Sequence, residues 1–271
     1  MNYRADLHCH STCSDGTCSP IELLELAKEK GLSALSITDH DTLDAYCDET
    51  FAKAEQLGLS LFPGVEFSAQ FQRRSIHILG YGVQKVEAIL TFCDEHKKRR
   101  VVRNREILVL LQRLGLVIAE EELLAYHKEK VIGRPHIAAL MVRKGYVATV
   151  QEAFDRFLGE NKPCFSPGPV VTARETLDVI HQAHGKAFLA HPHFIHNKAL
   201  LKALFQLDFD GFECYYARLP AAQEKKWVDL ARSQGKLISG GSDFHGTTKP
   251  DLPLGCSWVG AQEVEKIFGT T

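Results

Sequence analysis

The chain has 271 residues, enough for one large domain or for a domain that carries a sizeable insertion. Hydrophobic residues (45%) and charged residues (24%) occur at the frequencies of globular proteins, which excludes fibrous and disordered classes. The 32 Lys and Arg residues nearly balance the 34 Asp and Glu residues, so bulk charge does not bind nucleic acid or membranes. An anionic partner must therefore be bound at a local site.

The N-terminus, the apolar runs and the cysteines bear on the compartment of the protein. The N-terminus carries charged residues and histidines, and no apolar run reaches the roughly 18 residues of a membrane span. Eight cysteines without a CxxC pair are typical of reduced thiols, so we expect a cytoplasmic protein with no membrane partner. A structural zinc site at Cys9, Cys13 and Cys18 is an alternative, but the second ligand pair of such a site is missing. The oligomeric state stays open, and a monomer is compatible with the sequence.

The first part of the chain alternates β-prone runs with helical patterns. Strands are expected at residues 4–8, 32–38, 59–65 and 75–81, and helices at 20–30 and 43–57. Ser19 before Pro20 is a helix start signal, and Gly31 and Gly58 are stop signals.

The middle of the chain is predicted to be entirely helical, with helices at 97–115, 120–128, 135–144 and 150–158. Alternation then returns, with helices at 173–184, 198–205 and 221–234 and strands at 187–190, 211–214, 237–239 and 256–259. This order predicts an α/β sheet or barrel formed by residues 1–96 and 168–271 and interrupted by a helical insertion at 97–167.

Histidines and carboxylates recur where the expected strands end. These residues are His8, His10, Asp15, Asp39, His40, Glu66, His77, His191, Asp243 and His245. The strand ends of an α/β barrel converge, so we expect these side chains to meet at one end of the molecule. A single HxH pattern is usually a pair of core histidines, but the recurrence of imidazole with carboxylate predicts a site for Zn²⁺, Mn²⁺ or Fe²⁺.

The same residues stand in short motifs along nearly the whole chain. The motifs are ADLHCHS (5–11), SDG (14–16), ITDHD (37–41), GVEFS (64–68), HILGY (77–81), LAHP (189–192) and GSDFH (241–245). This set resembles that of the PHP (polymerase and histidinol phosphatase) family of metal-dependent phosphoesterases. The resemblance implies a distorted β/α barrel with three divalent metal ions, and a water activated between two of them that attacks phosphorus.

The resemblance also implies an assignment of ligands. The first ion would be held by His8, His10, Glu66 and Asp243; the second by Glu66, His77 and His191; the third by Asp15, His40 and His245. All nine ligand types are present, which implies an active enzyme. Asp39 is expected to orient His40 or to cap a loop. His193 is either a general acid or an ordinary loop histidine.

The insertion adds a narrower resemblance. The segments VIGRPHIA (131–138) and FLGENKP (157–163) resemble one PHP subgroup that acts on nucleoside 3′,5′-bisphosphates and on the 5′ ends of short oligonucleotides. Arg134 at the start of a helix, with His136 nearby, would suit a second phosphate. The alternative is a structural salt bridge from Arg134 to residues 120–122.

Other candidate substrate contacts are less distinct. Arg100 and Arg103 belong to a basic helix start that either guides a nucleotide or is solvated. Phe194, Tyr215 and Tyr216 either stack a base or belong to the core.

These patterns predict a metal-dependent phosphoesterase that acts on a nucleotide bisphosphate or a short oligonucleotide. The alternatives are a histidinol-phosphate phosphatase or another small-molecule phosphatase, and a non-enzymatic PHP domain.

Overall fold

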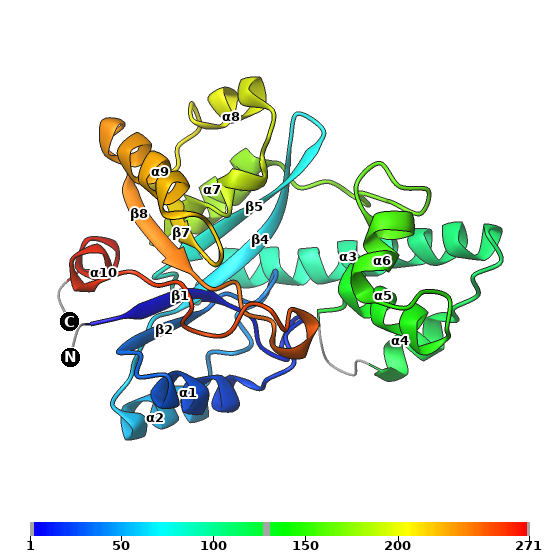
Figure 1. Cartoon of the computed structure of the whole chain (residues 1–271), viewed down its shortest axis with the longest axis horizontal. Helices are drawn as coiled ribbons and strands as arrows, with labels where there is room; N and C mark the ends of the chain where they lie inside the picture. Colours follow the sequence, from blue (N-terminus) through cyan, green and yellow to red (C-terminus); the bar gives the residue numbers. More distant parts are fainter. Residues whose placement is uncertain (1–2, 127–130, 270–271) are drawn as a thin grey trace. The chain divides into compact units, whose positions relative to one another are not determined.

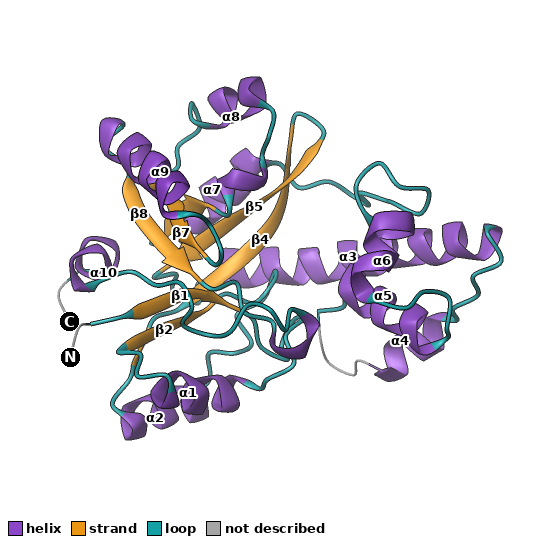
Figure 2. Ribbon diagram, viewed as in Figure 1, coloured by secondary structure: helices purple, strands orange, loops and turns teal. Residues whose placement is uncertain are grey.

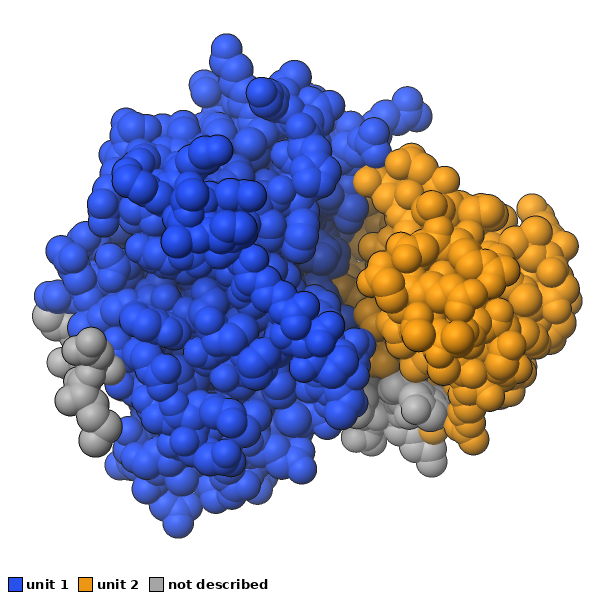
Figure 3. All heavy atoms as spheres, viewed as in Figure 1, with its two compact units in different colours: residues 1–93, 171–271 blue, residues 94–170 orange. Residues whose placement is uncertain are grey.

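The computed structural model describes residues 3–126 and 131–269 (Figure 1). The chain divides into two compact units, Met1–Cys93 with Val171–Thr271, and Asp94–Val170 (Figure 3). The expected insertion, 97–167, falls inside the second unit. Each unit has a hydrophobic core of its own, the first with Leu24, Ile37 and Phe212 among its buried residues and the second with Ile107 and Ile137.

Two sheets form the centre of the first unit (Figure 2). One contains the parallel strands β1 (Ala5–Cys9), β2 (Ala34–Ile37) and β3 (Ser60–Leu61). The other contains, in spatial order, β4 (Gly64–Phe71), β5 (Arg74–Tyr81), β6 (Lys186–Leu189), β7 (Gly211–Tyr216) and β8 (Leu237–Gly241). β4, β5 and β6 are antiparallel neighbours, whereas β6, β7 and β8 run parallel.

Single bridges join the two sheets at two seams. Cys9 pairs with Phe244 beyond β8, and the Asp243 N–H donates to the His8 carbonyl at 2.8 Å. His40 beyond β2 pairs with Glu66 in β4. In the described part of the chain the strands form no continuous closed ladder, so the barrel is distorted. The seams bring the ends of β1, β2 and β8 to the start of β4.

Helices cover the outer faces of these sheets (Figure 1). They are α1 (Pro20–Glu29), α2 (Asp48–Leu57), α7 (Ala173–Gln182), α8 (Lys198–Leu204), α9 (Ala221–Ser233) and α10 (Ala261–Phe268). The predicted start of α1 is confirmed: the Ser19 hydroxyl accepts from the Glu22 N–H at 3.2 Å, and the Glu22 carboxylate accepts from the Ser19 N–H at 2.6 Å. Short 3-10 turns at Pro192–Phe194 and Gly246–Thr248 follow β6 and β8.

Four expected elements differ from the structure. The helix expected at 97–115 is α3 (Glu87–Arg113), which begins ten residues earlier than expected. α2 begins at Asp48 instead of residue 43, because the Tyr46 hydroxyl binds the backbone of Ile37 and Gly64 and holds this segment in a turn. The strand expected at 59–65 is divided between β3 and the hairpin of β4 and β5. At 256–259 only Val259 pairs, with Ala5, and the Cys256 N–H closes a turn on Pro253.

The described part of the second unit contains helices only. α3 (Glu87–Arg113) crosses the boundary between the units, and the remaining helices are α4 (Glu120–Tyr126), α5 (Arg134–Arg143), α6 (Val150–Ala153) and a π-helical turn at Phe154–Leu158. The end of the helix expected at 120–128 lies outside the described residues. Within those residues, none of the helices combines the length and apolar character needed to cross a membrane.

Candidate metal centre

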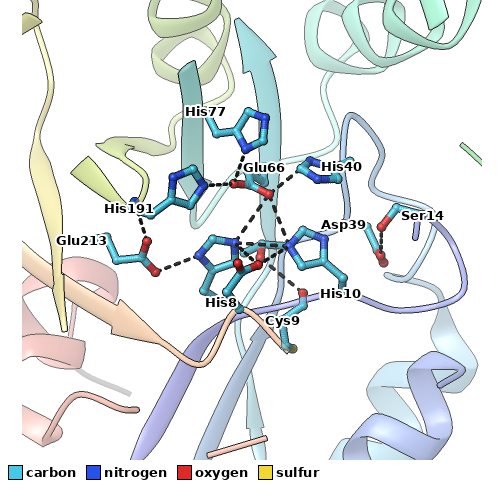
Figure 4. A network of polar contacts seen from close by, with 12 residues as sticks. His8, Cys9, His10, Ser14, Asp39, His40, Glu66, His77, His191 and Glu213 are labelled. Atoms are coloured by element: carbon cyan, nitrogen blue, oxygen red, sulfur yellow. Dashed lines mark hydrogen bonds and ion pairs between the residues drawn. The ribbon is translucent and has the colours of Figure 1, made fainter. Parts of the chain in front are cut away.

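All nine expected ligands lie in the first unit, and their contacts form one network. Figure 4 labels six of them, namely His8, His10, His40, Glu66, His77 and His191. His8 lies on β1, and His10, His40, His191, Asp243 and His245 follow the ends of parallel strands, as expected. Glu66 and His77 are exceptions, because they lie inside the antiparallel strands β4 and β5. Glu66 reaches the other ligands because β4 starts where β2 ends.

Glu66 is the centre of the network, fully buried between five imidazole rings. Its Oε2 lies near His8 Nε2 (3.5 Å), His10 Nε2 (3.3 Å) and His40 Nδ1 (3.1 Å). Its Oε1 lies near His77 Nδ1 (2.9 Å) and His191 Nε2 (3.0 Å). The two oxygens therefore face different sets of histidines.

The two aspartates face the remaining ring nitrogens. Asp243 Oδ1 lies 3.4 Å from a nitrogen of His8, of His10 and of His245. Asp15 lies 3.4 Å from His245 and 3.7 Å from both His10 and His40.

Three groups of side chains have ligand atoms close enough together to hold a metal ion. They are His8, His10 and Asp243; His40, Glu66 and His77; and His10, Asp15, His40 and His245. His191 belongs to none of these groups, although it contacts Glu66. The groups differ from the expected sets in that His10 and His40 each belong to two of them.

The separations around Asp243 and Asp15 suit divalent cations better than direct hydrogen bonds. An ion about 2.1 Å from each of its ligands holds tetrahedral ligand atoms roughly 3.4 Å apart. The contacts of Asp243 and Asp15 have this length, and the buried Nδ1 of His10 has no hydrogen-bond partner. This donor set fits a metal centre.

Charge at the centre also suits a cation. Burial alone would raise the pKa of Glu66, but its electrostatic interactions with the surrounding histidines, His77 first, hold that pKa well below its usual value. Burial works against ionisation of Asp243 as well, yet Lys249 and His245 hold its pKa well below the usual value. Burial lowers the pKa of His40 to about 3, which leaves a neutral imidazole. Burial works against protonation of His8 and His10, yet the carboxylates around them raise the pKa of His10 to about 9 and that of His8 well above its usual value. A bound cation would take the place of these protons, because ionised carboxylates and neutral imidazoles are the forms that bind metal ions.

Asp39 holds the loop after β1. It accepts from the Ser11 N–H (2.8 Å), the Ser11 hydroxyl (2.5 Å) and the Ser14 hydroxyl (2.6 Å). Of its two expected roles, these contacts match the loop cap. The loop that it fixes contains Asp15.

Two residues that contact expected ligands, Glu213 and Lys249, were absent from the sequence prediction, and a third, Tyr216, was named there only as a base-stacking or core residue. Glu213 on β7 binds His8, while Tyr216 and Lys249 each bind Asp243 Oδ2 at 2.7 Å. Glu213 left a signal that could have been used, because an acidic residue inside an apolar strand needs a partner. Lys249 left none, since it lies in an ordinary polar loop.

His193 and the aromatic candidates Phe194 and Tyr216 lie beside this network. The His193 ring packs on Phe194 and Tyr216, with centroids 4.2 and 4.4 Å away, and burial lowers its pKa to about 4. Tyr216 is buried, whereas Phe194 is 57% exposed. Tyr215 packs at the edge of the core. A catalytic role for His193 stays a prediction.

The other candidates lie in the second unit. Arg134 is the first residue of α5; its guanidinium donates to the Leu158 carbonyl at 3.3 Å and lies over the rings of Phe154 and Phe165. Burial lowers the pKa of Arg134, and the positive charge of Arg100 lowers it further. His136 Nδ1 accepts from the Gly133 N–H at 2.8 Å, so this histidine caps the helix.

The structure brings Arg100 to the start of α5. A Cβ at Gly133 would lie 3.0 Å from the Arg100 guanidinium, so glycine permits this approach, whereas Arg103 packs on Gly168. The alternative salt bridge of Arg134 to residues 120–122 gains no support, because in the described part of the chain Glu120 pairs with Arg105 and Glu122 with Lys144.

A distorted β/α barrel with clustered imidazoles and carboxylates defines a class, that of metal-dependent hydrolases. The model of the PHP domain family matches residues 6–161. The chain belongs to the PHP domain family, and the fold and enzyme class expected from the motifs are confirmed: it is a metal-dependent phosphoesterase.

Known relatives agree with this family. The chain is 33% identical to a 5′-3′ exoribonuclease of Haemophilus influenzae, with 96% of this chain and 93% of that one covered. It is 30% identical to a phosphoribosyl 1,2-cyclic phosphate 1,2-diphosphodiesterase of Eggerthella lenta (89% and 94% covered). It is 28% identical to a 3′,5′-nucleoside bisphosphate phosphatase of Chromobacterium violaceum (89% and 86% covered). Among solved structures, a metal-dependent phosphoesterase of Bifidobacterium adolescentis superposes with a TM-score of 0.86 at 30% identity and covers 98% of this chain and 96% of that one.

Proposed function

We propose that this phosphoesterase hydrolyses phosphate esters of nucleotides, namely nucleoside 3′,5′-bisphosphates, short oligonucleotides from the 5′ end, or both. The observation that carries the proposal is the network around Glu66, in which every expected ligand is present and buried or half-buried. Names of relatives support the substrate class, because two of them act on RNA or on nucleoside bisphosphates.

Three divalent ions, Mn²⁺, Fe²⁺ or Zn²⁺, would be held by the expected sets. His8, His10, Glu66 and Asp243 would hold one; Glu66, His77 and His191 a second; Asp15, His40 and His245 the third. The division of the Glu66 oxygens between two sets of histidines supports its role as the shared ligand. When bound, such ions supply Lewis acidity that activates water and polarises phosphoryl oxygens.

The side chains themselves position this chemistry. Asp243 is fixed by Tyr216 and Lys249, and the loop of Asp15 is fixed by Asp39. Burial of the carboxylates excludes water from their lone pairs, which strengthens their attraction for cations. Three divalent ions carry more charge than the three carboxylates, so the loaded centre would attract a phosphate dianion.

Arg134 would bind the second phosphate of the substrate. The positive charge of Arg100 and the negative charge of Glu160 both act on its guanidinium, and of the two the Arg100 charge is the stronger influence. The N-terminus of α5 adds a partial positive charge. We therefore assign the helical insertion the role of a substrate cap, with Arg134, His136 and Arg100 as its phosphate contacts. Arg103, which packs on Gly168, stays a predicted substrate contact.

A histidinol-phosphate phosphatase is the second candidate function. Its substrate carries a cationic amine, and the neighbouring positive charges of Arg134 and Arg100 disfavour such a group. We also propose a cytoplasmic location, supported by the eight cysteines, which form no disulfide in the described part of the chain.

Phosphate release from adenosine 3′,5′-bisphosphate tests the proposal, with Mn²⁺ and again after chelation. We expect chelator-sensitive conversion to a monophosphate, and stepwise shortening of a 5′-phosphorylated RNA oligomer. Histidinol phosphate and phosphoribosyl 1,2-cyclic phosphate serve as comparison substrates. If the protein hydrolysed one of these comparison substrates but neither adenosine 3′,5′-bisphosphate nor RNA, the substrate would be reassigned and the metal centre retained.

A further inference from the structure

Glu213 is a buried carboxylate that contacts two of the expected ligands. Its side chain and that of His8 are both fully buried. One oxygen lies 2.7 Å from His8 Nδ1, and the other accepts the backbone N–H of His191, also at 2.7 Å (Figure 4). Glu213 therefore links β1 to the end of β6 from its position on β7.

The contact with His8 selects one tautomer of the ring. A carboxylate only accepts hydrogen bonds, so Nδ1 carries a proton, and in the neutral ring Nε2 then has the lone pair that can bind a metal ion. That nitrogen faces Glu66 at 3.5 Å and Asp243 at 3.4 Å. Glu213 thus turns the metal-binding nitrogen of His8 toward the carboxylates.

The contact with His191 holds an unusual backbone conformation. His191 has a φ of +29°, a region that residues with a Cβ rarely adopt. With this backbone its Nε2 lies 3.0 Å from Glu66 Oε1. The hydrogen bond to Glu213 fixes the turn that makes this contact.

We propose that Glu213 is a positioning residue that couples the two metal positions sharing Glu66, one through His8 and the other through His191. The inference rests on the ligand assignment of the proposed function. Among the described residues Glu213 has no hydrogen bond or ion pair with Asp15, His40 or His245. The third position is therefore independent of it.

Asp210 provides a matched control beside the same strand. Its carboxylate also accepts from a backbone N–H, that of Ala187 at 2.7 Å, and lies 2.8 Å from a histidine nitrogen, that of His181. His181 is not an expected ligand. Asp210→Asn therefore disturbs a similar pair of hydrogen bonds without touching the metal centre.

The experiment compares the metal content and metal affinity of purified wild-type, Glu213→Gln and Asp210→Asn proteins after dialysis against graded chelator. Glutamine has one acceptor oxygen for two donors, so Glu213→Gln should weaken two of three bound ions by about 10–100-fold and retain the third. Asp210→Asn should match the wild type. Circular dichroism of the metal-free proteins checks the fold, and Glu213→Asp, which keeps the charge but shortens the reach, replaces the glutamine variant if that variant does not fold.

Equal stoichiometry and affinity in the wild type and in the folded Glu213 variant would overturn the positioning role while leaving the metal centre intact. Loss of all three ions would overturn the independence of the third position. A wild type that binds no divalent ion would overturn both the ligand assignment and this inference.

Discussion

At the scale of single residues, Asp243 shows how neighbours prepare a ligand. Tyr216 and Lys249 both bind its Oδ2, which leaves Oδ1 facing His8, His10 and His245. Desolvating a carboxylate is costly unless its oxygens are paired, and here each oxygen has partners of complementary charge or polarity. The residue types of the ligands were predictable from the motifs, but the partners on the far oxygen were not.

Replacing Asp243 tests its assignment as a ligand. We expect Asp243→Ala to lose metal and activity together, because the expected set of the first ion loses its aspartate. Metal content by elemental analysis and phosphate release measure the two effects. Asp251, 75% exposed and paired with Arg218, is the control, since Asp251→Ala should keep both properties. Full metal content in an inactive Asp243→Ala protein would contradict the assignment.

Replacing Arg134 tests the second phosphate site. Arg134→Ala should raise KM for a nucleoside bisphosphate by at least about tenfold, since charged hydrogen bonds contribute about 1.5–3 kcal/mol. KM for p-nitrophenyl phosphate, which has one phosphate, should change little. Arg156 also lies over a phenylalanine ring but is paired with Glu152, so Arg156→Ala should leave both values unchanged. Equal losses on both substrates would indicate a structural role for Arg134.

At the scale of elements, local sequence signals predicted the ends of helices better than the pairing of strands. The capping box of α1 and the left-handed Gly58 after α2 were readable because they depend on neighbouring residues only. The hairpin of β4 and β5 was not readable, because its turn places Gln72 and Arg73 at φ values of +46° and +65° without the usual Asn-Gly sequence. Glu66 was therefore expected at a strand end but lies inside β4.

Removal of the cap of α1 tests the contribution of that element. Ser19→Ala should lower the free energy of unfolding by about 1 kcal/mol, because an N-terminal N–H loses its acceptor. Urea unfolding measures the change, and Ser19→Thr should restore most of it. Phosphatase activity should be unaffected, since Ser19 is not among the expected ligands. An unchanged midpoint would show that the capping box contributes no net stability.

At the scale of the whole molecule, the two units divide the expected roles. The first contains the nine expected ligands, and the second contains Arg134 and Arg100. Separate hydrophobic cores explain how the helical segment can be inserted without interrupting the barrel, since each unit buries its own apolar residues.

Metal removal tests the link between the centre and the stability of the molecule. Chelation should lower Tm, because ions bound only by the folded state stabilise it, by about 2.7 kcal/mol per site at a hundredfold excess over Kd. Differential scanning calorimetry with and without chelator measures the shift. The Asp243→Ala protein should show a smaller shift. An identical Tm for the wild type in both conditions would argue against metal binding by the folded chain.

The sequence by itself determined the residue types of the metal centre, the helix caps and the helical character of the insertion, because these depend on short motifs and on local periodicity. Only the tertiary structure decided which side chains meet. His8 and Glu213 are 205 residues apart, and His191 and Glu66 are 125 residues apart. Such contacts follow from strand order and register, and a shift of one residue turns every side chain of a strand to the other face.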